Sequence, residues 1–218
     1  NMMPAQSRDA RVYVSIENLA KWDSYYGGYS PEAAASCGYD GIEKLHGGGT
    51  MIVTSTGIID GVIQDQYGGR GTQFNENGVP TFSLPLKIEE APERTVSFAV
   101  VLEDKDAYPV TGGFAWIHWL AANITRQELK ENESQTAHDF IQGCNSWTSI
   151  QGNNQSKELS CFYGGMTPPN QAHTYELHVF ALDCLLDLET GFYLNELYHK
   201  MERHILAQHT LKGISEKV

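Results

Sequence analysis

Residues 114–124 read FAWIHWLAANI, an almost unbroken apolar run of the length expected for a buried strand. Two further runs of the same kind are TVSFAVVL at Thr95–Leu102 and TYELHVFAL at Thr174–Leu182. Continuous apolar strands are typical of sheets that are covered on both faces. The three runs therefore predict the centre of a β-rich domain.

Weaker patterns predict the elements around this centre. Met51–Ser55 and Phe82–Ile88 are strand candidates, although Pro85 restricts the second to a sheet edge or an irregular piece. Asn195–Gln208 carries an apolar stripe at helical spacing, and the polar segment Gln127–Glu133 predicts one helical turn. Together these patterns predict a single β-rich domain with a late helix.

The first 50 residues differ in pattern from the rest of the chain. They hold a short apolar alternation at Val12, Val14 and Ile16 and several glycine-rich stretches. We interpret residues 1–50 as an N-terminal extension that packs on the domain or on a partner subunit, and residues 51–218 as the domain. The run HGGG at 46–49 imitates an esterase oxyanion motif, but the chain has no G-x-S-x-G elbow.

The charge balance excludes several kinds of partner. Fifteen lysines and arginines stand against 27 aspartates and glutamates, which gives a formal net charge of −12. Nucleic-acid binders need clustered cations, and anionic membranes attract basic segments, whereas the basic residues here are scattered. No apolar run approaches the ~20 residues of a membrane-spanning helix. We expect neither nucleic-acid binding nor a membrane span.

Four cysteines, at positions 37, 144, 161 and 184, form neither a C-x-x-C motif nor a dense disulfide framework. We interpret them as small buried side chains or reduced thiols, and expect no metal and no cofactor. The start of the chain has no basic segment followed by an apolar one, as a secretory leader would. This pattern favours a cytoplasmic protein.

Three segments place titratable residues beside the predicted strands. They are EDKDAYP at Glu103–Pro109, WIHW at Trp116–Trp119 and YGGMTPPNQAHTY at Tyr163–Tyr175. His173 and Tyr175 share one face of a strand, because side chains alternate with a period of two. Two acids after a strand, a histidine within an apolar strand and a loop ending in His-x-Tyr can converge on one pocket.

Taken in order, these segments resemble the phosphatidylethanolamine-binding protein family, in particular its bacterial, Raf-kinase-inhibitor-like branch. The family's acidic motif D-P-D-x-P stands here as DKDAYP at 104–109, and its H-W pair as His118-Trp119. Its loop Y-G-G-P-x-P-P-x-x-x-H-x-Y matches Tyr163–Tyr175, and its tail H-I-L-A-x-x-x-L-x-G matches His204–Gly213.

The resemblance implies a mainly β fold, a largely antiparallel β-sandwich domain with a few peripheral helices. It also implies a non-catalytic protein with a pocket for a small anion such as phosphate or phosphoethanolamine. The implied pocket residues are Asp104, His118, Thr167, Pro168, Pro169, His173 and Tyr175. Imidazole becomes cationic near pH 6.5, and more readily beside a carboxylate, so we expect the histidines to donate to anion oxygens. Asp106 is expected to brace its loop. By analogy we also expect a protease or kinase as regulated partner, and a homodimer.

Four residues depart from the family pattern. Lys105 replaces the first motif proline, Tyr108 is inserted before the second, Met166 replaces a proline and Ile88 a usual tryptophan. The loop changes could alter or abolish binding. They support one alternative, an interaction protein with a vestigial pocket.

Two chemical alternatives also stay open. His118 or His173 could act as the general base of a hydrolase with Asp104 orienting it, although no nucleophile is evident beside them. The same three residues could form a two-histidine, one-carboxylate metal site, which we favour less than an anion pocket. His178 falls on the opposite strand face from His173. Three further histidines recur every five residues, which spreads them around a helix and indicates structural or surface roles: His199, His204 and His209.

Overall fold

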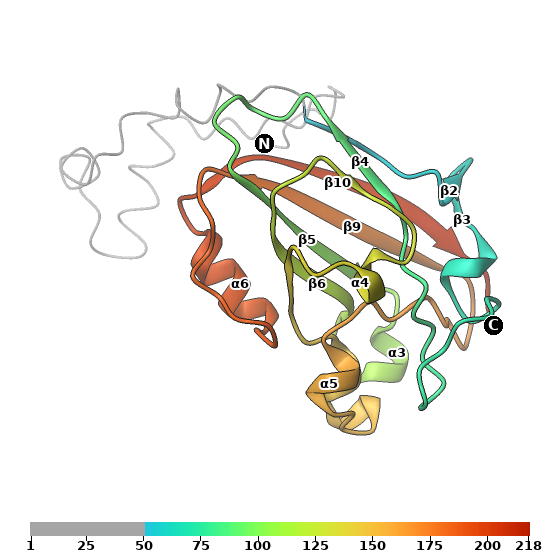
Figure 1. The fold of residues 1–218 in the computed structure, drawn as a ribbon. Helices are drawn as coiled ribbons and strands as arrows, with labels where there is room; N and C mark the ends of the chain where they lie inside the picture. The colour runs from blue at the N-terminus through green and yellow to red at the C-terminus, as the bar shows by residue number, and fades with distance from the viewer. Residues whose placement is uncertain (1–50) are drawn as a thin grey trace, which may run out of the picture. The chain divides into compact units, whose positions relative to one another are not determined.

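The computed structural model describes residues 51–218, so the interpretation of residues 1–50 as a packed extension lies outside the described residues (Figure 1). Within 51–218 the strands are β1 (Ile52–Thr54), β2 (Ile58–Ile59), β3 (Val62–Ile63), β4 (Leu86–Glu89), β5 (Ser97–Asp104), β6 (Trp116–Ile124), β7 (Glu128–Leu129), β8 (Ile141–Gln142), β9 (His173–Leu182) and β10 (Ile205–Ser215). The helices are α3 (Tyr108–Thr111), α4 (Glu133–Thr136), α5 (Lys157–Ser160) and α6 (Leu194–Met201), with 3-10 turns η2 (Asp65–Tyr67), η3 (Ser146–Thr148) and η4 (Ile150–Gly152).

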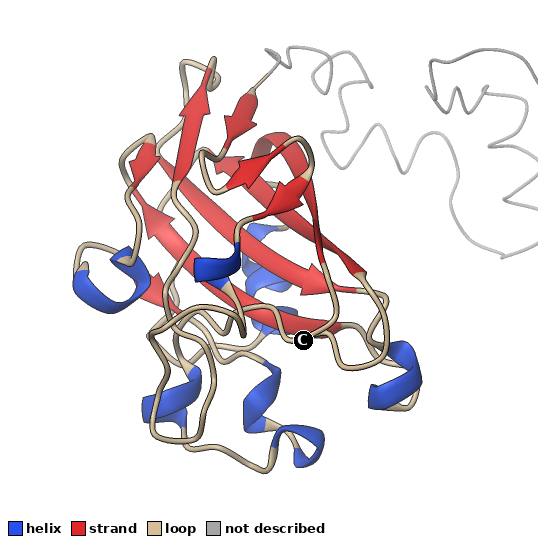
Figure 2. Ribbon diagram, turned by 90° about the vertical axis from the view of Figure 1, so that its right-hand side faces the viewer, coloured by secondary structure: helices blue, strands red, loops and turns tan. Residues whose placement is uncertain are grey.

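The strands form two sheets. The larger sheet has the order β2-β3-β10-β9-β5-β6-β8, and the smaller one has the order β1-β4-β7. Neighbouring strands are antiparallel except β3 and β10, which run parallel. Figure 2 shows that the helices are short and that most of them lie below the strands in that view. The prediction of a mainly β, largely antiparallel domain with few peripheral helices is confirmed.

The central strands are buried on both faces, which explains their continuous apolar sequence. On one face of β5, Val100 and Leu102 pack in a core shared with Val53 and Leu86 of the smaller sheet. On the other face, Val101 joins a second core with residues of α6. Both faces of the larger sheet are covered by apolar side chains. Apolar and polar residues therefore do not alternate along its central strands, which explains a run such as TVSFAVVL.

The C-terminal segment corrects one prediction. The helix predicted over Asn195–Gln208 ends at Met201, and β10 begins at Ile205 and pairs with nearly the whole of β9. Arg203 between them has a φ of 71°, which a helix does not accommodate. The apolar stripe is therefore helical only as far as Met201, and hydrogen bonding along a ten-residue neighbour, β9, decides the rest.

The three histidines spaced five residues apart therefore do not lie on one helix. His199 lies in α6, His204 in the turn and His209 in β10. The Nδ1 of His204 lies 2.8 Å from an Asp183 carboxylate oxygen, and that of His209 lies 3.1 Å from the Met51 carbonyl.

Two other local predictions need adjustment. The strand predicted from Phe82 starts only at Leu86, directly after Pro85, which has no N–H to donate to a ladder. The polar segment from Gln127 begins with the short strand β7, and the helical turn α4 follows it. Ile88, which replaces a family tryptophan, is a 4% exposed core residue of β4. No helix within residues 51–218 is both long and apolar enough to span a membrane.

Candidate functional site

Three strands of the larger sheet bring the predicted site residues to one end of the molecule. Strand β5 ends at Asp104, β6 begins at Trp116 and β9 begins at His173. The antiparallel register sets Asp104 directly opposite Tyr175 on one side and Trp116 on the other. The short helices α3 and α5 lie at the same end (Figure 1). We call Asp104, His118, His173 and Tyr175 the candidate site; each is between 1% and 3% exposed.

Asp104 is the centre of the hydrogen bonding. Its Oδ2 accepts from Nδ1 of His173 at 2.7 Å, and its Oδ1 accepts the backbone N–H groups of Asp106 and Ala107 at 2.9 and 3.1 Å. Three donors therefore compensate one buried carboxylate, which a buried charge requires. The Asp-x-Asp sequence makes this possible, because the chain turns back over Asp104 immediately after the strand.

His118 behaves differently from the expectation of a readily cationic imidazole. Its Nδ1 lies 2.6 Å from the carbonyl of Gly164, which only accepts, so Nδ1 carries the proton. Complete burial lowers its pKa below the usual value, and the nearby Asp104 charge offsets this only in part. In the neutral ring Nε2 has a free lone pair, and it has no hydrogen-bond partner within residues 51–218.

Tyr175 stands beside His118 with an unused hydroxyl. The two rings meet edge to face, with centroids 5.1 Å apart. The hydroxyl oxygen is buried and has no hydrogen-bond partner among the described residues. Burial, followed by the negative charge of Asp104, raises the pKa of Tyr175 well above its usual value, so the hydroxyl keeps its proton. A buried O–H that makes no hydrogen bond is rare in folded proteins and requires an explanation.

Two residues of the site were not predicted from the sequence. Asn170 is exposed, yet its Oδ1 lies 2.8 Å from Nε2 of His173 and covers that nitrogen. Trp147, from η3, packs edge-on against His118 with centroids 5.3 Å apart. Asn170 directly follows the Pro-Pro pair and could have been suspected from that position. Trp147 had no local signal, because only the tertiary fold brings it to the site.

The remaining predicted residues lie around this cluster. Thr167 is half-buried, Pro168 is buried and Pro169 is exposed. The Thr167 side chain makes no hydrogen bond within the described residues. Asp106 lies on the loop after β5, and its Oδ2 accepts the backbone N–H of Thr174 at 2.8 Å, which ties that loop to β9.

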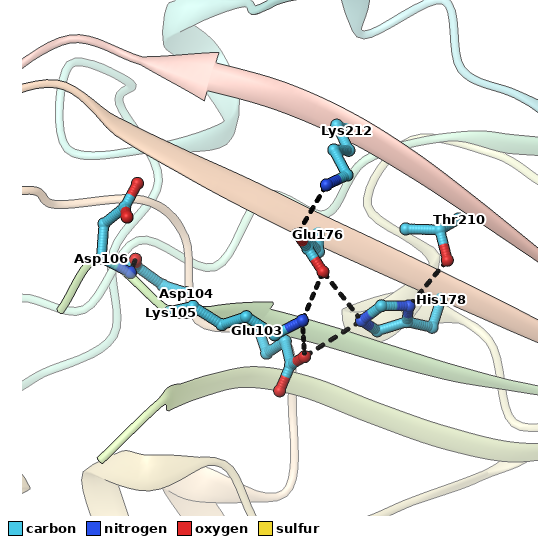
Figure 3. A network of polar contacts seen from close by, with 8 residues as sticks. All are labelled: Glu103, Asp104, Lys105, Asp106, Glu176, His178, Thr210 and Lys212. Carbon is cyan, nitrogen blue, oxygen red and sulfur yellow. Dashed lines mark hydrogen bonds and ion pairs between the residues drawn. The ribbon is translucent and has the colours of Figure 1, made fainter. Parts of the chain in front are cut away.

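Lys105, the first departure from the family motif, points away from the candidate site. Its Nζ lies 3.1 Å from Glu103 and 2.5 Å from Glu176, on the other face of the sheet (Figure 3). Lys105 and then Lys212 hold the pKa of Glu176 at about 2. His178 lies in the same network, 3.0 Å from Glu103. The lysine therefore joins an ion-pair cluster with Glu103 and Glu176 and makes no contact with the Asp104 carboxylate.

The other two loop departures also avoid the buried cluster. Tyr108 begins α3 and is 60% exposed. Met166 is fully buried in the core, and its sulfur accepts a hydrogen bond from the hydroxyl of Tyr163 at 3.2 Å. Neither side chain therefore belongs to the buried cluster around Asp104.

The hydrogen bonds of the two histidines bear on the metal and hydrolase alternatives. His173 uses both ring nitrogens, for Asp104 and Asn170, and His118 turns Nδ1 to a carbonyl. The ligand atoms that lie within 4.8 Å of one another in the described part of the chain belong to other groups, Asp183/Cys184/His204 and Glu103/Glu176/His178. On the side away from Asp104, His173 meets an amide rather than a hydroxyl or thiol that it could activate.

The sequence matches the family model described as phosphatidylethanolamine-binding protein over residues 54–216. This chain belongs to the phosphatidylethanolamine-binding protein family. Its identity to YxkA, an uncharacterised protein of Bacillus subtilis, is 41% over 155 residues, which cover 69% of this chain and 91% of YxkA. A protein of Methanothermobacter thermautotrophicus is 33% identical over 152 residues, which cover 65% of this chain and 93% of the relative.

Solved structures of the phosphatidylethanolamine-binding protein family share this fold. The homologue CT736 of Chlamydia trachomatis superposes with a TM-score of 0.63 at 27% identity, covering 78% of this chain and all of CT736. Escherichia coli YbcL, described as a member of the same family, gives a TM-score of 0.60 at 22% identity, covering 77% of this chain and 99% of YbcL. At 22% identity the likeness to YbcL concerns the fold alone.

Proposed function

We propose that this protein is a non-catalytic binding protein whose candidate site takes a small anionic group, a phosphate or a phosphomonoester. One observation carries the proposal: the buried hydroxyl of Tyr175 makes no hydrogen bond of normal geometry with the described residues, although the Asp104 carboxylate is close enough to raise its pKa. The free Nε2 of His118 lies on the neighbouring ring. An anion oxygen between these two groups would satisfy the O–H donor, which otherwise stays unpaired at a cost of about 1–3 kcal/mol.

The charges of the site are compatible with such a ligand. The carboxylate of Asp104 is compensated by His173 and two backbone N–H groups, so it does not present a free negative charge. Neutral His118 can accept a proton from a protonated phosphate oxygen, and the resulting imidazolium would donate a charge-assisted hydrogen bond. The Thr167 hydroxyl is a further free donor. A few such bonds correspond to a Kd of about 1 mM.

The biological setting belongs to the same proposal. Membership of the phosphatidylethanolamine-binding protein family supports a ligand-binding role. We infer a cytoplasmic protein that regulates a protease or kinase partner and forms a homodimer, as the family resemblance implies. A sedimentation experiment that finds only monomer would exclude the homodimer.

Tyr175→Phe tests the anion site with the smallest structural change. The substitution removes an oxygen that has no partner, so the free energy of unfolding should fall by less than about 1 kcal/mol, or rise. With about 10 mM phosphate or phosphoethanolamine and a Kd near 1 mM, the wild type should gain about 1.4 kcal/mol, a Tm rise of roughly 3–6 °C. The variant should lose most of that rise in a thermal-shift titration.

Ethanolamine, which lacks the anion, is the control ligand and should shift neither protein. Tyr193→Phe is the matched control variant, because Tyr193 is 43% exposed and lies next to α6. Equal phosphate-induced shifts in the wild type and in Tyr175→Phe would refute the proposed role of the hydroxyl.

Asn170→Ala should strengthen anion binding. Asn170 occupies the outward nitrogen of His173, which in the protonated ring can donate to an anion, and it covers a site that is nearly closed. Removing one competing hydrogen bond, worth about 0.5–1.5 kcal/mol, should lower the Kd for phosphate by roughly 2–12-fold. Isothermal titration of the wild type and the variant measures this change. A weaker affinity would show instead that Asn170 is itself a ligand-binding residue.

A further inference from the structure

The cysteines Cys144 and Cys161 lie side by side in the interior. Their sulfur atoms are 3.4 Å apart, and both residues are at most 5% exposed. The Cys144 thiol also lies 3.4 Å from the carbonyl oxygen of Gly191. Seventeen positions separate the two cysteines in the sequence, so the tertiary fold creates this contact.

The backbone holds the two cysteines opposite each other. The N–H of Asn145 donates to the carbonyl of Ser160 at 2.9 Å, and the Asn145 side chain donates to the carbonyl of Phe162 at 2.9 Å. Cys161 directly follows the last residue of α5, and its own N–H donates to the carbonyl of Lys157 at 3.0 Å. A disulfide has an S–S distance of about 2.0 Å, so the two sulfur atoms, 3.4 Å apart, need only a short further approach to form the bond.

We propose that Cys144 and Cys161 are a redox modification site that forms an intramolecular disulfide with a low-molecular-weight disulfide as oxidant. One cysteine thiolate attacks the oxidant, forms a mixed disulfide and releases one small thiolate. The second cysteine, as its thiolate, then attacks the mixed disulfide, closes the Cys144–Cys161 bond and releases the second small thiol. The protein loses two protons and two electrons, and the oxidant is reduced to two thiols.

The segment closed by this bond forms one wall of the candidate site. Within it, the hydroxyl of Ser146 accepts the backbone N–H of Ile117 at 2.8 Å. Trp147 packs against Trp116 and His118, with centroid distances of 5.2 and 5.3 Å. A disulfide would tie both ends of residues 145–160 together and restrict how far Trp147 can move from His118. Neither this bond nor its test depends on the proposed anion binding.

The same environment makes the reaction slow in the folded protein. Burial, followed by the hydrogen bond to Cys144, raises the pKa of Cys161 to about 12, so its thiolate is scarce at neutral pH. Cys184 is only partly buried and is the competing thiol in the described part of the chain. Oxidation during refolding should therefore form the Cys144–Cys161 disulfide in a larger fraction of the molecules than oxidation of the native protein.

The test is a tryptic map of the full chain refolded from urea with oxidised glutathione and digested without reduction. Lys157 lies between the two cysteines, so trypsin separates them into residues 131–157 and 158–200. The expected product is these two peptides joined by one disulfide, in the wild type and in Cys184→Ser but not in Cys161→Ser. The oxidised protein should melt roughly 6–12 °C above the reduced one, as a closed loop of this length predicts.

Two results would overturn the proposal. In the first, both cysteines are still alkylated as free thiols after oxidative refolding, or Cys144 pairs with a cysteine other than Cys161. In the second, the Cys144–Cys161 disulfide forms but lowers the Tm, which would mean that the native geometry excludes it. Peptide 158–200 also holds Cys184, so the Cys184→Ser variant carries the main readout, and the test does not depend on the folding of Cys161→Ser.

Discussion

Replacing Asp104 with alanine should lower the free energy of unfolding by about 3–5 kcal/mol. The carboxylate is 3% exposed and accepts from His173 and from the N–H groups of Asp106 and Ala107. Removing it strands three buried or partly buried donors at once, and leaving donors unpaired is more destabilising than losing a hydrogen bond at the surface. Urea unfolding followed by circular dichroism measures the change.

Asp106→Ala is the matched control for this prediction. Asp106 is half-buried and accepts one backbone N–H, that of Thr174. Its removal should lower the free energy of unfolding by only about 1 kcal/mol. An equal decrease in the free energy of unfolding in the two variants would show that the buried Asp104–His173 pair contributes no more to stability than the Asp106 hydrogen bond.

Gly165→Ala should destabilise the protein by about 3 kcal/mol or more. A Cβ at this position would lie 2.3 Å from the carbonyl oxygen of Tyr67 and 3.1 Å from the Cα of Gly68. These are backbone atoms, so no rotation of a side chain relieves the overlap. The variant should unfold at a markedly lower urea concentration, or accumulate as insoluble protein.

Gly164→Ala makes an instructive comparison. Its Cβ would lie 2.4 Å from the ring of Trp147, a side chain that can rotate or shift. We expect a smaller loss of stability, about 1–3 kcal/mol, together with displacement of Trp147 from His118. If Gly164→Ala proved the more damaging of the two, the distinction between backbone and side-chain overlap would be wrong. The two glycines are thus needed for different reasons: Gly165 leaves room for the backbone at Tyr67, and Gly164 leaves room for the ring of Trp147.

Local patterns were enough to predict the centre of the fold. Strands β5, β6 and β9 were predicted from apolar runs, because a strand covered on both faces has only apolar side chains to offer. The family motifs identified Asp104, His118, His173 and Tyr175, and the register of β5 and β9 explains why they meet. The prediction of a helix beyond Met201 was wrong, because this segment pairs with β9, and that pairing outweighs a short apolar stripe at helical spacing.

Contacts between distant segments decided the chemistry of the site. Burial, which no local pattern reports, makes His118 a neutral acceptor rather than a ready cation. The packing of Trp147 on His118 arises only when segments far apart in the sequence fold together, whereas Asn170 covers His173 from within the same loop. The facing thiols of Cys144 and Cys161 have the same origin. Residue types and their periodicity were enough to predict the central strands and the family. The protonation of His118, the exposure of the site and the contact between the two thiols depend on distances that only the folded chain sets.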